Sequence, residues 1–343
     1  MTSGETVARF TTGMTRTTVT KAPGGYVWTR RPGKDVRDDP HHTPGPVPDD
    51  FTRRAAAASG ATFTFATPAT WTDGAYTFHV GGHRSVAQLL MEGALKDAEA
   101  AAGGARAFGR HLKAFHTADA ADPTRSAPGP EYPAPRYPAR LASWLRTAAG
   151  TRAAPAFHTI LREGLGAARW DTLAGYADEA LSPRGDPAVV IGWATLGSLI
   201  VADDADAAAK EPGAAEGPGT ADGAGAGPHA ALLCGPDGAF AAPEIDLGCA
   251  LGELHEIAAS LTARGMDTEP VTAWREALLD GYGTPLDLAR TARTAVVRIA
   301  AHAHDFAAYV GFHTELHAYV GMLADLLDNE GSQTTVITAR ERP

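Results

Sequence analysis

The spacing of the apolar residues changes near residue 80, and this change constrains the fold more than any other feature of the sequence. Before it, short runs rich in Thr, Val, Phe and Tyr are separated by Gly-, Pro- and Asp-containing turns, which is typical of strands. After it, apolar residues recur at helical spacing over most of the chain. The sequence therefore predicts an α+β protein with a small β-rich lobe at residues 1–80 and a large helical lobe at residues 81–330.

Four strands are expected in the small lobe, at residues 7–21, 26–33, 61–71 and 75–80. A Pro-Gly-Gly turn separates the first two, and a Thr-Asp-Gly turn separates the last two. Between the two pairs, residues 51–60 predict a helix that Asp49 or Asp50 caps and that stops at Gly60.

In the large lobe, residues 85–118 predict two helices with a break near Gly103 and Gly104, because glycine is a poor helix former. The remaining segments of this lobe are helices from 139 to about 180 and from 243 to 329, followed by a loose tail at 331–343.

Two short strands interrupt the helices, at residues 189–201 and 229–235. The segment between them, 203–228, is low in complexity and almost free of large apolar side chains. Such a segment cannot repay the entropy that ordering would cost. We therefore expect a disordered insertion that bridges the two strands of a β-hairpin.

The formal net charge of −10 argues against nucleic acid as a partner, since phosphate binding requires clustered Lys and Arg. No apolar run is long enough to cross a membrane and the N-terminus lacks a secretory signal, so we expect a cytoplasmic protein. The two cysteines are too few for a disulfide framework or a zinc cage. His313 and His317 lie on one face of an expected helix and could bind zinc, but no third ligand is evident.

Residues 189–204 have the outline of a catalytic loop, in which a tight turn joins two apolar strands. The turn between the two strands lacks the expected acid, base or amide that such a loop needs for general acid–base chemistry. The polar or bulky side chains of the turn are Trp193, Thr195 and Ser198. The stretch is therefore either an active site in an unfamiliar form or one that has lost its chemistry.

In the order of its elements and in several short motifs, the chain resembles the aminoglycoside phosphotransferase and choline kinase branch of the protein-kinase-like fold. The stretches that carry the resemblance are 26–33, 108–116, 189–201 and 242–254. They resemble, in that order, a third strand ending in Leu-Arg-x-Pro-Pro-Gly, a helix ending in Leu-x-x-Leu-His, the His-Gly-Asp loop with its following Gly-Asn, and a helix that carries Asp-Leu-Gly. The resemblance implies a bilobal kinase-like fold and phosphoryl transfer from ATP with magnesium.

The residues that would carry this chemistry are replaced. On the resemblance, the histidine of the loop falls at Ile191, the catalytic aspartate at Trp193 and the metal-binding asparagine at Ser198. The second metal-binding aspartate falls near Leu233 and Cys234. Phosphoryl transfer in this fold requires a carboxylate that accepts the proton of the substrate, and ligands that hold magnesium. Neither requirement is met at these positions.

The carboxylates that lie near the expected site have different roles. Asp246 matches the aspartate of the Asp-Leu-Gly motif, which in the family is a structural residue bonded to the catalytic loop. Asp237 follows the strand that would carry the metal-binding aspartate, so it is the best-placed substitute, although a turn aspartate is the commoner role. Asp203 and Asp204 are either metal ligands or solvated charges. Glu253 is interpreted as part of an ordinary polar helix face.

Arg30 and Arg31 stand where the family has the cation that holds nucleotide phosphates, and arginine can bind phosphate through two hydrogen bonds. Both could equally be solvated charges on a strand. The connector glycines Gly81 and Gly82 fall where a nucleotide base would meet backbone groups, or they simply form a hinge. ATP and magnesium are therefore the candidate cofactors, and the metal ligands are unknown.

Residues 192–197, 231–238 and 246–254 look similar to degenerate kinase-like proteins of thioamitide and class V lanthipeptide biosynthesis, which modify ribosomally made peptides (RiPPs). In that family a kinase-like protein and a separate lyase convert Ser or Thr to dehydro residues by phosphorylation and elimination. The resemblance implies a precursor peptide and a partner lyase, with no role for nucleic acid or membrane.

Three functions stay open. The first is noncanonical phosphorylation of a precursor peptide, with Arg30 on phosphate and Asp237 or a nearby carboxylate on metal. The second is a pseudokinase that binds the peptide or supports the lyase without catalysis. The third, an aminoglycoside-type phosphotransferase, fares worst, because it depends on the aspartate that Trp193 replaces.

Overall fold

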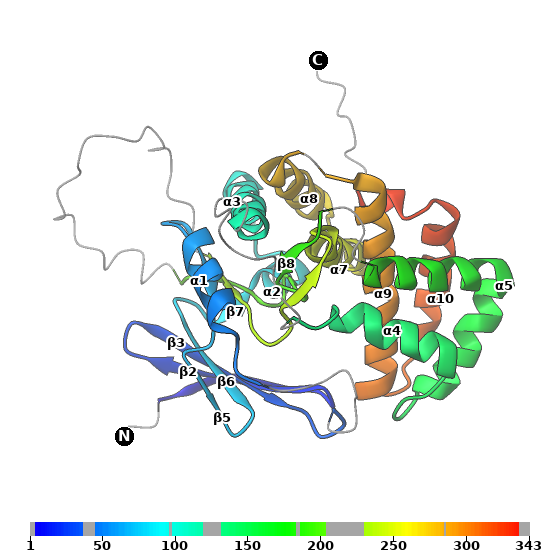
Figure 1. The fold of residues 1–343 in the computed structure, drawn as a ribbon, viewed down its shortest axis with the longest axis horizontal. Helices are drawn as coiled ribbons and strands as arrows, with labels where there is room; N and C mark the ends of the chain where they lie inside the picture. The colour runs from blue at the N-terminus through cyan, green and yellow to red at the C-terminus, as the bar shows by residue number, and fades with distance from the viewer. Residues whose placement is uncertain are drawn as a thin grey trace, which may run out of the picture.

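The computed structural model describes residues 4–36, 45–95, 98–118, 132–182, 186–203, 230–284 and 286–335. They form a small lobe built around a sheet and a large lobe of helices (Figure 1). The predicted α+β architecture, with a β-rich N-terminal region and a helical C-terminal region, is confirmed.

Five antiparallel strands form the small-lobe sheet in the order β1-β2-β3-β6-β5. Their bounds are β1 Thr6–Thr11, β2 Thr15–Ala22, β3 Gly25–Pro32, β5 Thr70–Thr72 and β6 Ala75–Val80. Asp73 and Gly74 lead from β5 into β6 with positive φ angles of 52° and 71°. This is the conformation of a two-residue hairpin turn that matches the twist of its strands, so the predicted Thr-Asp-Gly turn is confirmed.

A second sheet joins the two lobes in the order β4-β10-β9-β7, and β8 pairs separately with β11. Their bounds are β4 Phe63–Ala66, β7 Arg84–Ser85, β8 Ala188–Val190, β9 Leu199–Val201, β10 Ala230–Leu233 and β11 Ala239–Ala241. β9 and β10 form the predicted hairpin, with Ala230 opposite Val201. The first half of 189–201 does not belong to it, because β8 pairs with β11 instead. The expected insertion at 203–228 lies outside the described residues, apart from Asp203.

Two of the predicted strands are divided in the structure. Residues 7–21 belong to two strands, because the chain reverses at a turn in which the Thr12 amide donates to the Thr15 carbonyl at 2.9 Å. Residues 61–71 are also two strands, since β4 leaves the small-lobe sheet and pairs in parallel with β10. An alternating pattern marks strands but does not specify the partner that each strand takes.

Helix α1 (Asp49–Ala58) packs between the small-lobe sheet and the large lobe (Figure 1). The prediction of an aspartate cap is wrong, because a proline holds the N-cap position and both aspartates lie in the first turn. There they still favour the helix through its dipole. Phe51 is fully buried and meets the ring of Phe115 edge-on, with centroids 5.2 Å apart.

The described helices of the large lobe are α2 Val86–Met91, α3 Ala98–Thr117, α4 Arg136–Thr147, α5 Ala154–Leu181, α7 Glu244–Ala263, α8 Glu269–Tyr282, α9 Leu288–Tyr309 and α10 Glu315–Asp328, with a 3₁₀ turn at Ser332–Thr334. The predicted break near Gly103 and Gly104 is wrong, because α3 runs through both. The chain leaves the helix earlier, after Met91, where Gly93 has a positive φ of 62°. Tertiary packing of the apolar face that follows outweighs the low helix propensity of two glycines.

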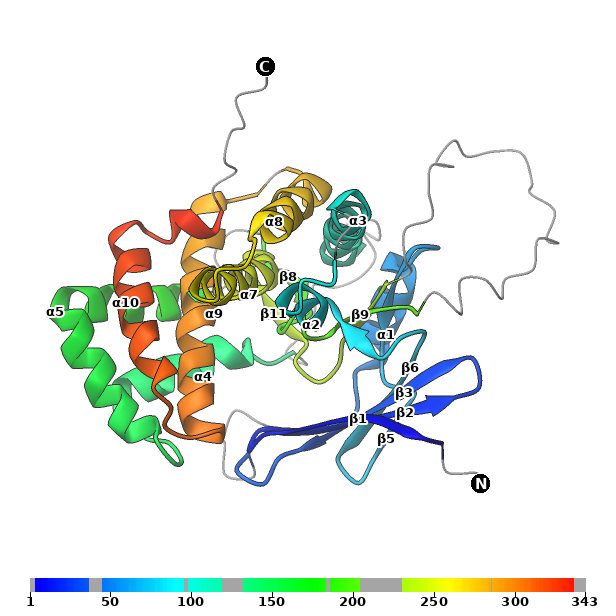
Figure 2. The same cartoon turned by 180° about the vertical axis from the view of Figure 1, so that it is seen from behind.

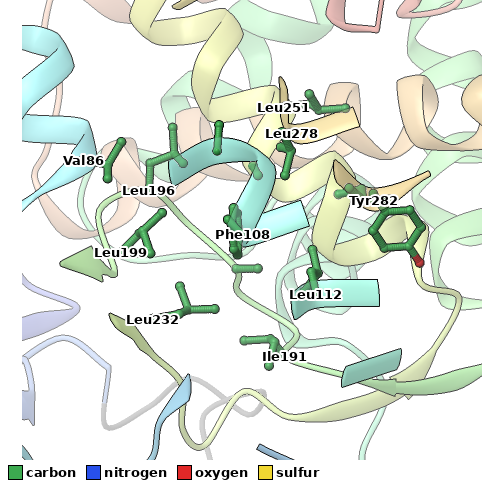
Figure 3. Packing of buried hydrophobic residues seen from close by; sticks show 14 of the residues in the cluster. Val86, Phe108, Leu112, Ile191, Leu196, Leu199, Leu232, Leu251, Leu278 and Tyr282 are labelled. Carbon is green, nitrogen blue, oxygen red and sulfur yellow. The ribbon is translucent and has the colours of Figure 1, made fainter. Parts of the chain in front are cut away.

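Glycines let α3 and α8 pack closely. A Cβ at Gly109 would lie 2.3 Å from the carbonyl oxygen of Leu278, and one at Gly281 would lie 2.2 Å from that of Arg106. Around this contact, residues of both helices form one core cluster with Ile191, Leu196 and Leu199 of the 189–204 stretch (Figure 3). The loop is therefore anchored in the main core of the large lobe. None of the described helices combines the length and apolarity needed to span a bilayer.

Candidate functional site

The loop between β8 and β9 is held by a buried carboxylate. Asp246 on α7 accepts hydrogen bonds from the backbone amides of Ile191 at 2.7 Å and Gly192 at 2.8 Å. His116, at the end of α3, lies 2.9 Å from the same carboxylate. The contact that the resemblance implies between Asp246 and the loop is therefore present. Gly192 is required here, because its φ is +79° and a Cβ would lie 1.8 Å from the carbonyl oxygen of Asp237.

A second carboxylate on α7 holds the other half of the loop. Glu253 accepts from the amide of Leu196 at 2.5 Å and from that of Gly197 at 3.3 Å. The interpretation of Glu253 as an ordinary polar helix residue is wrong. Its spacing of seven residues from Asp246 places both on one face of the helix, and this signal could have revealed it. Two carboxylates thus fix the loop backbone and are not available to a substrate.

Trp193, which the resemblance places at the position of the catalytic aspartate, is partly buried between two side chains. Its ring meets Tyr137 edge-on, with centroids 5.4 Å apart, and the Arg298 guanidinium lies 5.9 Å from its centroid. Arg298 in turn forms a buried ion pair with Glu256. An indole nitrogen donates hydrogen bonds and cannot accept a proton, so the position has no general base.

Ser198, which the resemblance places at the position of the metal-binding asparagine, contacts the small-lobe cation Arg30 directly. Arg30 on β3 donates to the Ser198 hydroxyl at 3.1 Å, and the Thr195 hydroxyl donates to it at 3.0 Å. Burial lowers the pKa of Arg30 to about 10, and the charge of Asp237 opposes the shift. Arg30 therefore remains a cation at neutral pH and lies where an anion entering the cavity would meet it.

Cys234, which the resemblance places near the second metal-binding aspartate, is buried directly after β10. Burial raises the pKa of its thiol well above the usual value, so the sulfur stays protonated at neutral pH. The thiol donates to the carbonyl of Ala66, with a sulfur–oxygen distance of 3.6 Å. A protonated thiol is not a ligand for magnesium, which prefers oxygen.

These side chains line one cavity of about 320 Å³ between the lobes. Trp193, Thr195, Ser198, Arg30, Arg31, Cys234 and Asp237 all border it. Asp237 is its one carboxylate among the described residues, and Arg136 donates to that carboxylate at 3.3 Å. The described residues contain no group of three His, Cys, Asp or Glu side chains that could hold a metal ion. Magnesium therefore does not fit the side chains of this cavity.

The connector glycines do not share this cavity. Gly81 borders a separate hollow of about 260 Å³, and the carbonyls of both glycines accept hydrogen bonds from inside the protein. The Asp203 amide donates to Gly81 at 3.1 Å, and the Trp28 indole donates to Gly82 at 3.0 Å. A Cβ at Gly82 would lie 1.7 Å from the carbonyl oxygen of Val201, so close backbone packing explains this glycine.

Asp203 is not free to act as a metal ligand. Tyr26 donates to its carboxylate at 2.6 Å, and His83 lies 2.9 Å from the same oxygen. Tyr26 belongs to the small lobe and His83 to the connector, so this cluster ties the lobes together. Asp204 lies outside the described residues.

No protein-family model matches the sequence, and no curated protein shows significant similarity to it. Among solved structures, a glucosamine kinase in complex with glucosamine, ADP and inorganic phosphate matches with a TM-score of 0.50 and 15% identity over 92% of this chain and 79% of that one. Spectinomycin phosphotransferase in complex with ADP and spectinomycin matches with a TM-score of 0.47 and 8% identity over 95% and 93%. A Plasmodium vivax ethanolamine kinase gives 0.45 and 8% over 96% and 83%.

The likeness to the glucosamine kinase extends over most of both chains. At 15% identity it shows the fold and leaves the activity open. The chain therefore has a bilobal fold that it shares with this glucosamine kinase.

Proposed function

We propose that this chain is a pseudokinase of peptide natural product (RiPP) maturation, which binds a precursor peptide and supports a partner lyase without transferring phosphate by the magnesium-dependent route. One observation carries the proposal. The backbone of the loop is held by two carboxylates, the buried Asp246 and the partly buried Glu253, whereas Trp193, Ser198 and Cys234 supply neither a base nor metal ligands. A protein that needs the shape of the cleft but not the chemistry of a kinase would keep the fixed loop backbone and lose the reactive side chains.

The peptide and the lyase come into the proposal from the sequence resemblance to thioamitide and class V lanthipeptide proteins. The proposal keeps ATP as a candidate ligand of Arg30. A guanidinium can hold a phosphate group of a nucleotide or of a phosphorylated peptide without magnesium. The spectinomycin and glucosamine enzymes share the fold, but an aminoglycoside-type activity would need the base that Trp193 replaces.

Mixing the protein with a candidate precursor peptide, ATP and magnesium tests the proposal. We expect the peptide to bind, as read by fluorescence anisotropy, and no phosphopeptide to form, as read by mass spectrometry. Adding the lyase should give dehydrated peptide only from a peptide that was phosphorylated beforehand. Phosphopeptide formed by the chain alone would contradict the proposal.

The second candidate is noncanonical phosphorylation, and the position of Asp237 on the cavity favours it. If Asp237 acted as the base, Asp237→Asn should lower the phosphorylation rate by about 10²–10⁴-fold. Asp203→Asn is the matched control, because that carboxylate is bound by Tyr26 and His83 outside the cavity. Equal rates in both variants and the wild type would exclude this role for Asp237.

A further inference from the structure

A second groove lies at the end of the small-lobe sheet, beside the cavity described above. It has a volume of about 860 Å³ and is bordered by the β1–β2 turn, the end of β3, the β5–β6 turn and the end of α9. Figures 1 and 2 both show this end of the sheet reaching the C-terminal end of α9. The Gly13 amide donates to the Tyr309 carbonyl at 2.8 Å, so the two lobes together form its floor.

Three exposed cations line this groove. Arg16 on β2 and Arg31 on β3 are directly opposite each other in the sheet, and Lys34 follows the end of β3. Like charges directly opposite each other destabilise an antiparallel strand pair unless an anion lies between them. Within the described ranges, no carboxylate pairs with any of the three. The fourth cation, Arg152, is neutralised by an ion pair with Asp35 at 2.6 Å.

The groove also has an acidic and an apolar feature. Among the described residues of its lining, Asp73 in the β5–β6 turn is the exposed carboxylate, so three exposed cations there face one anion in a chain whose net charge is −10. Val310, 47% exposed, lines the end of the groove near α9. An inorganic anion would leave this valine uncovered, whereas a peptide with an apolar side chain would bury it.

The groove opens toward the first cavity. Arg31 and Pro32 line both, so a ligand held beside Arg16 and Lys34 lies next to the mouth of the cleft that contains Trp193. An extended chain advances about 3.3 Å per residue, so a few residues are enough to pass from one to the other.

We propose that this groove binds an acidic, extended peptide segment, whose carboxylates lie between Arg16 and Arg31 and beside Lys34, and whose apolar side chain covers Val310. The inference rests on the proposed function, because it names the part of the peptide that this chain recognises. Arginine pairs with carboxylates through two parallel hydrogen bonds, which gives the site its preference for Asp and Glu. Nucleic acid fits less well, since the lining that the structure describes holds no exposed aromatic side chain on which bases could stack.

The probe is a fluorescent peptide of about twelve residues with several glutamates and one leucine, long enough to span the groove as a strand. Binding to the full chain is measured by anisotropy at low and moderate salt. We expect the glutamine version of the peptide to bind about tenfold more weakly, and binding to weaken as salt screens the charges. Equal affinity for both versions, or tighter binding of a single-stranded DNA oligonucleotide, would overturn the proposal.

The decisive variant is Arg16→Glu with Lys34→Glu, which leaves every residue of the first cavity in place. It should lower the affinity for the acidic peptide by about tenfold or more, because reversed charges repel the ligand. The control is Arg9→Glu with Lys21→Glu, which makes the same change in net charge at exposed positions of β1 and β2 outside both cavities. It should change the affinity by about twofold or less. Equal losses in the two variants would show that only overall charge matters, and the groove would be rejected.

The two proposals fail in different ways. If a precursor peptide binds the wild type and the Arg16→Glu/Lys34→Glu variant equally, the groove is wrong and the pseudokinase function stands. If the acidic probe binds in the groove but no precursor peptide binds to the chain, the groove stands and the proposed function is wrong.

Discussion

Replacing Asp246 with alanine should lower the free energy of unfolding by about 3–5 kcal/mol, as expected when one member of a buried pair is removed. The side chains of Asp246 and His116 are 0% and 1% exposed, so water cannot replace the lost contacts. The substitution also leaves the amides of Ile191 and Gly192 buried without an acceptor. Urea unfolding followed by tryptophan fluorescence measures the loss.

Two comparison variants separate this effect from general damage to α7. Asp246→Asn keeps one acceptor oxygen, and we expect it to lose about 1–3 kcal/mol. Glu253→Ala removes a partly exposed acceptor from the same loop and should cost about 0.5–1.5 kcal/mol. An Asp246→Ala protein that unfolds at the same urea concentration as the wild type would show that this carboxylate does not hold the loop.

Replacing Asp305 with alanine should also lower the free energy of unfolding by about 3–5 kcal/mol, because it removes the carboxylate partner of the buried Arg140. Arg140 on α4 donates to Asp305 on α9 through two nitrogens, one of them at 2.8 Å, and His304 lies 2.9 Å from the same carboxylate. Adjacent residues such as His304 and Asp305 do not usually face each other on a helix, but here their side chains bond. Asp305→Asn keeps the shape of the side chain and removes only its charge, so it measures the effect of the charge alone.

The same pair predicts how stability depends on pH. Burial alone would raise the pKa of Asp305, but the charge of Arg140 and hydrogen bonds from His304 and Arg140 outweigh it and hold the pKa well below the usual range. Because the folded value lies below the unfolded value of about 3.9, the stabilisation is complete above about pH 5 and is lost as the pH falls. Asp305→Asn should flatten this part of the pH profile of the urea midpoint.

The control for the pH profile is Asp328→Asn, which removes an exposed ion pair with Arg169. Exposed pairs add little to stability, so this variant should keep the acid sensitivity of the wild type. A steep acid-induced loss that persists in Asp305→Asn would mean that other carboxylates cause it.

The division into a β-rich and a helical region was predictable because period-two and period-3.6 patterns follow directly from backbone geometry. The partners of individual strands were not predictable in this way. β4 is rich in Phe and Thr, like the strands of the small-lobe sheet near it in the sequence. It nevertheless pairs with β10, in which Ala230 lies opposite Phe63. The helix through Gly103 and Gly104 was missed because propensity is a weak guide when tertiary packing stabilises the helix.

At the site, the sequence shows which side chains are missing and the structure shows what replaces them. The family resemblance, and not the residue spacing by itself, places Trp193 and Ser198 at the positions of the catalytic aspartate and the metal-binding asparagine. The hydrogen bond between Arg30 and Ser198 crosses from one lobe to the other over 168 residues, so no local pattern contains it. By their place in the sequence, Gly81 and Gly82 are candidates for contact with a nucleotide base. Their close packing against the end of β9 explains why glycines stand at these positions.

Calorimetric titration of the protein with ATP, in the presence and absence of magnesium, is the measurement to make first. In the described residues the cleft keeps its loop but offers no cluster of side chains that would hold magnesium. We expect that magnesium does not strengthen ATP binding, and that any binding seen without magnesium is lost in Arg30→Ala. Saturable ATP binding that requires magnesium would show instead that other side chains have rebuilt the metal site.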